Sequence, residues 1–166
     1  MAIAIAIETP LQDDVRMLVA HLNDHLIPLS PLEFQFKMTV EQMADSDTTL
    51  FVARDETGRA VGMGALKVHS AELGEVKRMY TLPEVRGQRV GSLLLERIVG
   101  LARERDLPVV MLETGTGDGM AEAHRLYTRA GFVARGPFLD YPDSQWSAFF
   151  EFPLSAPACV AEAAAV

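Results

Sequence analysis

The stretch EVKRMYTLPEVRGQRVGSLLL, residues 75–95, decides the fold because a strand pattern passes directly into a helix pattern within it. A strand is predicted over 75–82, and a strongly amphipathic helix is predicted over 93–106. Between them lies RGQRVGS, residues 86–92, with two glycines and two arginines. Either this turn binds an anion, or it only connects the strand to the helix.

The chemistry of this turn suits an anion. The first turn of a helix has backbone N–H groups without intrahelical partners, and glycine lets a ligand approach the backbone closely. The helix dipole favours negative charge there, and Arg86 and Arg89 add positive charge. Glycines also occur at strand–helix junctions that bind nothing, so the turn alone leaves both interpretations open. It matches neither the G-x-G-x-x-G fingerprint nor a P-loop, which argues against a dinucleotide or a nucleoside triphosphate.

Outward from this turn, strands and helices alternate along the chain. Strands are predicted at 3–8, 49–55, 60–68, 75–82, 108–114, 132–138 and 146–152. Helices are predicted at 11–26, 93–106 and 120–130, the last of which ends at Gly131. A further short helix is predicted where Thr39 and Gln42 form a capping box. The order β-α-α-β-β-β-α-β-α-β-β predicts an α/β (α+β) fold, a mixed sheet with helices on its faces.

The composition argues against several classes of protein. The 166 residues carry a formal net charge of −8, whereas a nucleic-acid-binding protein normally presents a basic face. The single Cys159 permits no disulfide within the chain and no cysteine-based zinc site, as is typical of a cytoplasmic protein. The apolar start is too short for a signal peptide or a membrane span. We expect one domain over residues 1–154 and a disordered, Ala-rich tail over 155–166.

Two motifs resemble those of the GNAT superfamily of acetyl-CoA-dependent N-acetyltransferases. The first, R/Q-x-x-G-x-G/A, opens a helix after a strand and a proline, as residues 86–91 do here. The second, A-x-x-L-Y-x-x-x-G-F, matches AHRLYTRAGF, residues 123–132. The element order agrees from residue 3 to 153, and the ending GPFLDYPDSQWSAFFEFPL resembles small single-domain bacterial members. The resemblance implies the GNAT fold, with a mostly antiparallel sheet in which the strands at 75–82 and 108–114 splay apart.

One residue departs from the first motif, because the position that is glycine in the family is Arg89 in this chain. Arginine lacks the freedom of glycine at positive φ, so we expect a helical backbone at residue 89. Contacts that a ligand makes through backbone N–H groups would be retained. Arg89 would then either add charge to the turn or mark a site with a weaker grip on its ligand.

The resemblance implies that acetyl-CoA is the co-substrate and that no metal takes part. Its pyrophosphate would bind the turn, whose residues are Arg86, Gly87, Gln88, Arg89, Val90, Gly91 and Ser92. Its pantetheine arm would pair like an added strand with the backbone of Met79, Tyr80 and Thr81. A backbone N–H near Met79 would face the thioester oxygen and stabilise the charge that develops on it.

Direct transfer of the acetyl group needs a base for the amine and an acid for the departing thiolate. Tyr127 occupies the position where family members place a phenol beside the sulfur, although it could instead pack the helix face. For the base, family members use acids at the points occupied here by Glu113 or Glu75, and an ordered water relay is a third alternative. Glu113 could instead cap the following loop, and Glu75 could pair with Lys77 or Arg54.

The acceptor would bind near the N-terminal helices, where His25 and Ser30 are polar candidates, together with Arg78 on the strand at 75–82. Arg78 and Lys77 could hold a substrate carboxylate, but a solvated strand face explains them equally well. His21 and His25 share one helix face, yet no third ligand lies near them in the sequence, so no metal site is expected.

Together these features predict an N-acetyltransferase that moves an acetyl group from acetyl-CoA directly to a primary amine of a small molecule in a ternary complex. One alternative is a protein or peptide N-acetyltransferase. Another is a GNAT-fold sensor or subunit that binds acyl-CoA without turnover. The chain could form a homodimer, and neither a nucleic acid nor a membrane is expected as a partner.

Overall fold

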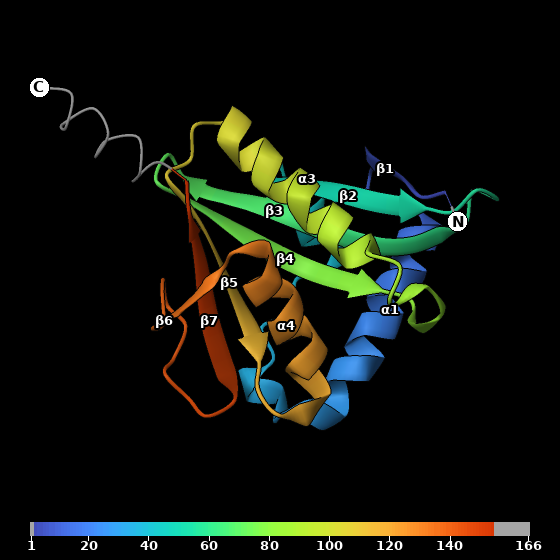
Figure 1. The fold of residues 1–166 in the computed structure, drawn as a ribbon. Helices are drawn as coiled ribbons and strands as arrows, with labels where there is room; N and C mark the ends of the chain where they lie inside the picture. Colours follow the sequence, from blue (N-terminus) through green and yellow to red (C-terminus); the bar gives the residue numbers. More distant parts are fainter. Residues whose placement is uncertain (1, 155–166) are drawn as a thin grey trace, which may run out of the picture.

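The computed structural model describes residues 2–154, in which one seven-stranded sheet is flanked by helices (Figure 1). The sheet order is β1-β2-β3-β4-β5-β7-β6, and only the β4–β5 pair is parallel. The strands are β1 (Ala4–Ile7), β2 (Thr48–Arg54), β3 (Ala60–Ser70), β4 (Leu73–Thr81), β5 (Val109–Gly115), β6 (Val133–Arg135) and β7 (Ser147–Pro153). The helices are α1 (Asp13–Leu26), α2 (Val40–Met43), α3 (Val90–Glu104) and α4 (Ala121–Ala130), with 3-10 turns η1 (Ile27–Leu29), η2 (Leu32–Phe34), η3 (Pro83–Val85) and η4 (Asp118–Met120).

The predicted order of strands and helices is confirmed. The capping box is present at α2, where Thr39 Oγ1 accepts from the Gln42 N–H at 3.1 Å and Gln42 Oε1 accepts from the Thr39 N–H at 2.8 Å. Gly131 ends α4 with a φ of 107°, a value that glycine adopts without strain. The tail predicted over 155–166 lies outside the described residues.

The differences lie at the ends of elements. α3 begins at Val90 rather than at 93, so the last part of RGQRVGS is the first turn of the helix. α1 begins at Asp13 rather than at 11, and the Leu11 side chain is half exposed before it. β6 covers only residues 133–135 of the predicted 132–138, because the chain leaves the sheet at Gly136 and Pro137.

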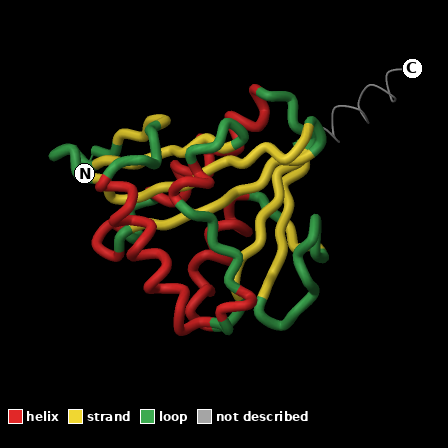
Figure 2. Tube along the Cα trace, turned by 180° about the vertical axis from the view of Figure 1, so that it is seen from behind, coloured by secondary structure: helices red, strands yellow, loops and turns green. Residues whose placement is uncertain are grey.

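Helices cover both faces of the sheet, with α3 and α4 on one side and α1 on the other (Figure 1 and Figure 2). α3 approaches β3 closely because two glycines of that strand face it. A Cβ atom at Gly62 would lie 3.2 Å from Leu94 Cδ1, and one at Gly64 would lie 3.0 Å from Ile98 Cδ1. Buried apolar side chains of the sheet and the helices form one core cluster. None of the helices in residues 2–154 combines the length and apolar character needed to span a membrane.

The sheet opens between β4 and β5. These strands pair only at Gly74 with Val110 and at Glu75 with Met111, so residues 76–81 of β4 have no partner on the β5 side. The predicted splay is therefore present, and β5 turns away from β4 in Figure 1. On its other side β4 carries a bulge: Tyr80 pairs with Met63, but the next pair joins Lys77 to Ala65.

Candidate functional site

The N-terminus of α3 presents unpaired backbone N–H groups. In the described part of the chain, the N–H groups of Gly87 and of residues 89–92 donate to no backbone or side-chain acceptor. The first bond of the helix joins the Leu93 N–H to the Arg89 carbonyl at 3.0 Å, and no side chain caps the helix. Free N–H groups at the positive end of a helix dipole form an anion-binding surface.

Arg89 does not have the helical backbone that we expected. Its φ of 65° and ψ of 17° lie in the left-handed region, and Gly87 is also left-handed with a φ of 85°. The expectation was wrong because it rested on the intrinsic preference of arginine. The turn must bring the chain from the buried Val85 to the buried Val90, and this packing overrides that preference. The Arg89 side chain is 73% exposed, so its charge lies at the surface of the turn.

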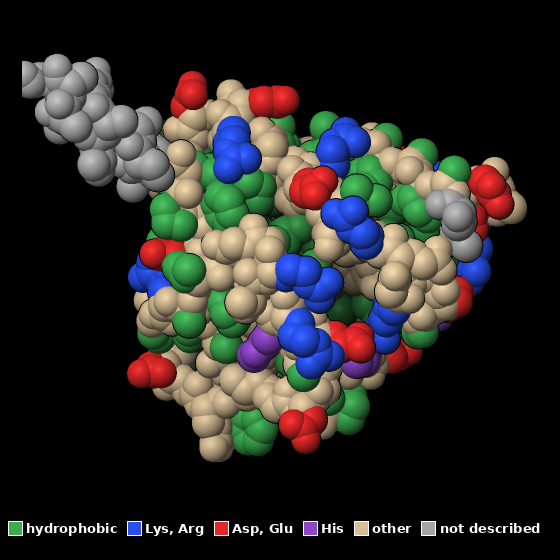
Figure 3. All heavy atoms as spheres, in the orientation of Figure 1, with side chains coloured by type: hydrophobic (Ala, Val, Ile, Leu, Met, Phe, Trp, Pro, Cys, Tyr) green, Lys and Arg blue, Asp and Glu red, His purple; other side chains and the backbone are tan. Residues whose placement is uncertain are grey.

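Arg86 ties the turn to the end of β4. Its Nη2 donates to the Thr81 carbonyl at 3.0 Å, and its guanidinium lies 5.7 Å from the centroid of the Tyr80 ring. Figure 3 shows Lys and Arg side chains around a hollow between the start of α3, the end of β4 and α4. This face of the molecule is therefore locally basic, although the chain as a whole is acidic.

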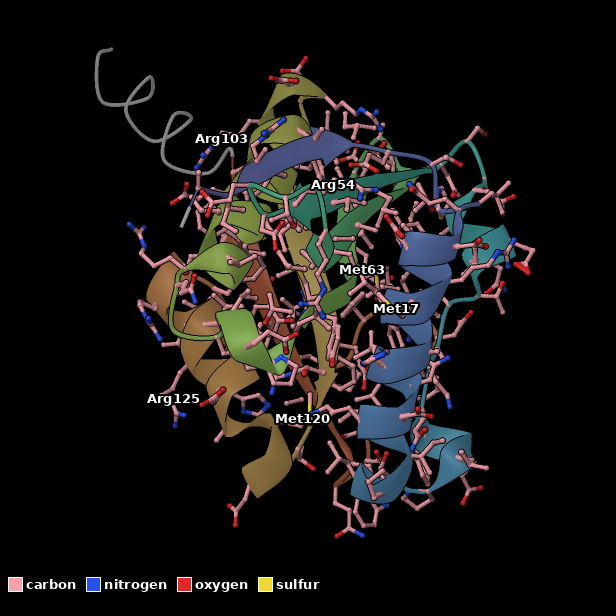
Figure 4. All side chains as sticks on the ribbon, turned by 90° about the vertical axis from the view of Figure 1, so that its right-hand side faces the viewer. Met17, Arg54, Met63, Arg103, Met120 and Arg125 are labelled. Carbon is pink, nitrogen blue, oxygen red and sulfur yellow. The ribbon has the colours of Figure 1, made fainter. Side chains whose placement is uncertain are left out.

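A cavity of about 140 Å³ lies beside the splay. Its walls come from α1, the segment after it, β4, β5 and α4. The lining residues are Leu22, Leu26, Ser30, Phe34, Gln35, Phe36, Lys37, Val76, Lys77, Arg78, Met79, Glu113, Thr114, Gly115, Met120, Ala123 and Tyr127. Figure 4 shows Met120, one of these lining residues, between the ribbons of α4 and α1.

Glu113 lines this cavity from β5. Its Oε2 accepts a hydrogen bond from Ser147 Oγ at 2.7 Å, so the carboxyl is fixed by the neighbouring strand and does not cap the loop that follows. Burial raises the pKa of Glu113, although the Ser147 bond and the charge of Lys77 act in the opposite direction. A carboxyl with a raised pKa takes up a proton more readily than an ordinary one.

Tyr127 lines the cavity from α4 and is buried. Its ring packs against Phe132 and Phe150, with centroid separations of 6.0 and 6.2 Å, so the packing that we considered as an alternative is also present. Burial, and after it the charge of Glu113, raises the pKa of the Tyr127 phenol. The phenol therefore keeps its proton at neutral pH.

Glu75 is only 2% exposed and lies at the centre of a polar cluster. Its Oε1 is 2.7 Å from His69 Nε2, its Oε2 accepts from Tyr141 Oη at 2.5 Å, and Lys77 Nζ lies 3.5 Å away. The predicted alternative of a pair with Lys77 is present, but the pair with Arg54 is not, because Arg54 binds Glu8 and Asp14 on another edge of the sheet. Glu75 does not line the cavity, which leaves Glu113 as the carboxylate in contact with it.

The three residues predicted to bind the acceptor lie in different surroundings. Ser30 and Arg78 line the cavity, whereas His25 is exposed at the end of α1 and is not part of the lining. Arg78 is 8% exposed, and its Nη2 donates to Asn23 Oδ1 of α1 at 2.5 Å. No group of three metal-ligating side chains occurs among residues 2–154.

Sequence analysis missed several residues of the site. Tyr141 reaches Glu75 from the β6–β7 loop, and Lys77 Nζ donates to the same phenol at 2.9 Å. Ser147 and Lys37 were also not singled out. Tyr141 lies 66 residues from Glu75, and Ser147 lies 34 residues from Glu113, so no local pattern indicates these two contacts. The one available signal was chemical: a polar residue on a strand that is otherwise apolar needs a partner.

Comparison with known proteins places this geometry in a family. The chain matches the family model described as Acetyltransferase (GNAT) domain over residues 46–134. It is 40% identical to a protein named IAA acetyltransferase from Azospirillum brasilense, over 92% of this chain and 98% of that protein. It is 34% identical to the uncharacterized N-acetyltransferase YedL of Escherichia coli, over 84% of this chain and 87% of the relative.

Solved structures agree with this match. A Klebsiella pneumoniae protein assigned to the acyl-CoA N-acyltransferases superposes with a TM-score of 0.75 at 31% identity, over 92% of this chain and 97% of that chain. A GNAT family acetyltransferase from Elizabethkingia anophelis with acetyl-CoA bound has a TM-score of 0.63 at 14% identity, over 92% of this chain and 98% of that chain. The second likeness concerns the fold alone.

Proposed function

Because the chain belongs to the GNAT acetyltransferase family, we propose that it moves the acetyl group of acetyl-CoA directly to the primary amine of a small molecule bound in the same complex. One observation carries this proposal. The unpaired edge of β4, residues 76–81, runs from the cavity towards the uncapped start of α3. An extended arm with a reactive group at one end and phosphates at the other fits this track.

The residues along the track suit the parts of acetyl-CoA, which supplies an activated acetyl group as a thioester. The free N–H groups of Gly87 and of residues 89–92, together with the charges of Arg86 and Arg89, would hold the pyrophosphate. The backbone of Met79, Tyr80 and Thr81 would hydrogen-bond the pantetheine arm as an added strand does.

The cavity offers the groups that direct transfer requires. Glu113 would take the proton of the attacking amine, and Tyr127 would protonate the departing thiolate. An N–H at the bulge near Met79 would stabilise the charge that develops on the carbonyl oxygen. Glu75 does not face the cavity, so its proposed role is indirect. It accepts a hydrogen bond from Tyr141, to which Lys77 also donates, and so holds Lys77 in position.

A small acceptor fits the cavity better than a protein does, because the space between side chains of α1, its following segment and α4 has a volume of only about 140 Å³. The lining combines apolar side chains with polar and charged groups, and such groups can fix the orientation of a small molecule.

The test is thiol release from acetyl-CoA in the presence of possible acceptors. The panel contains small amines, lysine-containing peptides, and IAA, the compound in the name of the Azospirillum brasilense relative. We expect release with one class of small amine and none with the peptides. Release with peptides alone would replace the proposed acceptor. Tight binding of CoA without release in any mixture would favour the sensor or subunit instead.

A further inference from the structure

The ionisable side chains that line the cavity are mostly cationic. They are Lys37, Lys77 and Arg78, against the single carboxyl of Glu113. This is the reverse of the whole chain, whose formal net charge is −8. Of these three cations only Arg78 is buried, and a buried cation is unfavourable unless an anion compensates it.

Lys77 is compensated within the protein. Its Nζ lies 3.5 Å from Glu75 Oε2 and donates to Tyr141 Oη at 2.9 Å, and its side chain is 14% exposed. These contacts hold the ammonium group in place and balance its charge. The excess positive charge of the cavity therefore rests on Lys37 and Arg78.

Arg78 is the buried one of these two cations, and no carboxylate within residues 2–154 forms an ion pair with it. Among the described residues, its guanidinium makes one hydrogen bond, to the neutral amide of Asn23, and its buried Nε has no partner. Burial lowers its pKa to about 10, which still leaves the group charged at neutral pH. Arg54 gives the contrast within the same chain, because it binds the carboxylates of Glu8 and Asp14 at 2.8 and 2.7 Å.

The position of Arg78 suits an acceptor rather than the co-substrate. It lies on β4 beside Met79, and a hydrogen bond to Asn23 connects it to α1, whereas the α3 turn proposed for the phosphates follows the end of β4 at Thr81. A guanidinium forms two parallel hydrogen bonds with a planar or tetrahedral oxyanion.

We propose that the acetyl acceptor is an amine that also carries an oxyanion, a carboxylate or a phosphonate, which Arg78 binds while the amine faces Glu113. This inference rests on the proposed acetyl transfer and specifies its substrate class. Arg78 and Met79 both lie at the β4 bulge. An acceptor whose anion binds Arg78 therefore has its amine near Met79, where the thioester is proposed to lie.

The first experiment compares matched acceptors at saturating acetyl-CoA. L-amino acids are tested beside their amides, their decarboxylated amines and their aminoalkylphosphonate analogues, with thiol release as the measurement. We expect the carboxylate or the phosphonate series to be acetylated, and kcat/KM to fall by about 10- to 100-fold in the amides, as the loss of a charge-assisted hydrogen bond predicts. The preferred series identifies the oxyanion.

The second experiment changes the arginine. Arg78→Met should raise the acceptor KM by at least about tenfold and leave the Kd of acetyl-CoA unchanged, because only the acceptor loses a partner. Arg78→Lys should recover part of the affinity for the acceptor, since lysine keeps the positive charge but cannot form the two parallel hydrogen bonds of a guanidinium. A merely structural role would instead raise both constants or lower the unfolding midpoint, which thermal unfolding of each variant reports.

The outcomes separate the two proposals. Equal kcat/KM for an amino acid and its amide would overturn the anion inference and leave acetyl transfer standing. The same holds if Arg78→Met folds and keeps the wild-type acceptor KM. If no compound in the panel gave thiol release, the proposed function itself would fail, and the acceptor class would fail with it. The acceptor panel needs only the wild-type protein, so it tests the anion inference even if the Arg78 variants do not fold.

Discussion

Arg89 adopts a backbone conformation that costs a residue with a Cβ atom about 1–2 kcal/mol and costs glycine little. Arg89→Gly removes this strain but also gives the unfolded chain more freedom, so the free energy of unfolding should rise by no more than about 1 kcal/mol. Arg89→Ala is the matched control, because it removes the same charge but keeps the Cβ atom. Chemical denaturation measures the difference, and an alanine variant more stable than the glycine variant would contradict the expected strain.

Glu113 predicts a pH dependence. Burial raises its pKa, so the carboxyl remains protonated above the ordinary value of 4.5, and a protonated carboxyl cannot act as a base. The kcat/KM of the wild type should therefore increase with pH through this raised pKa and then level off. Glu113→Gln should lower kcat/KM by about 10²–10⁴-fold and abolish this rising limb of the pH profile.

Ser147→Ala is the control for that prediction. It deletes the hydrogen bond that lowers the pKa of Glu113, so the same limb should move to higher pH while activity at high pH is retained. If Glu113→Gln keeps both the activity and the limb, the base is Glu75 or a water relay.

Tyr127 can be tested without loss of its packing. Tyr127→Phe keeps the ring contacts with Phe132 and Phe150 and deletes only the hydroxyl. We expect kcat to fall by about 10²-fold or more while the Kd of acetyl-CoA is unchanged. Steady-state kinetics and calorimetric titration measure the two constants. An unchanged kcat would assign Tyr127 to packing alone.

At the scale of elements, the start of α3 should lose its ligand when it acquires a negative charge. Gly91→Asp should weaken CoA binding by at least about tenfold relative to Gly91→Asn, since the two side chains have the same shape and differ in charge. Both variants place a Cβ atom 3.1 Å from Leu126 Cδ2, so the comparison between them controls for this steric effect. Gly100→Asp places the same charge on the same helix, in open space, and should leave binding unchanged.

The elements themselves could be predicted from the sequence because their patterns are local. Hydrophobic periodicity, the capping box at α2 and Gly131 after α4 each act over a few residues. The splay came from resemblance rather than from periodicity. The conformation of Arg89 could not be predicted, because buried residues on either side of the turn fix it against the preference of arginine.

The polar contacts of the site were even less accessible to sequence analysis. The burial of Arg78 depends on α1, and the network of Glu75 depends on Tyr141 from a loop near the end of the chain. Each contact joins residues that are more than 50 positions apart along the chain. Such pairs are set by the packing of whole elements, which single-residue preferences do not encode.

At the scale of the whole molecule, we propose that residues 1–154 are the complete folding unit. Leu154 packs against the core, and its N–H donates to the Pro108 carbonyl at 2.8 Å. A chain ended after Leu154 should therefore change the free energy of unfolding by less than about 0.5 kcal/mol. A chain ended after Glu151 is the control: it loses Leu154 and also Phe152, whose ring packs against Phe132, and should be several kcal/mol less stable. Equal losses in both would place part of the folding unit beyond 154.

The lengths of the strands have a consequence for aggregation. The outer strands β1 and β6 are only four and three residues long, so they offer a second molecule few free backbone groups for intermolecular pairing. The longer unpaired stretch, residues 76–81, faces an internal slit between two strands of the same sheet. A strand of another molecule pairs most readily with an outer edge, and this stretch is not one. The backbone groups that would promote fibre formation at an outer edge therefore lie inside the sheet.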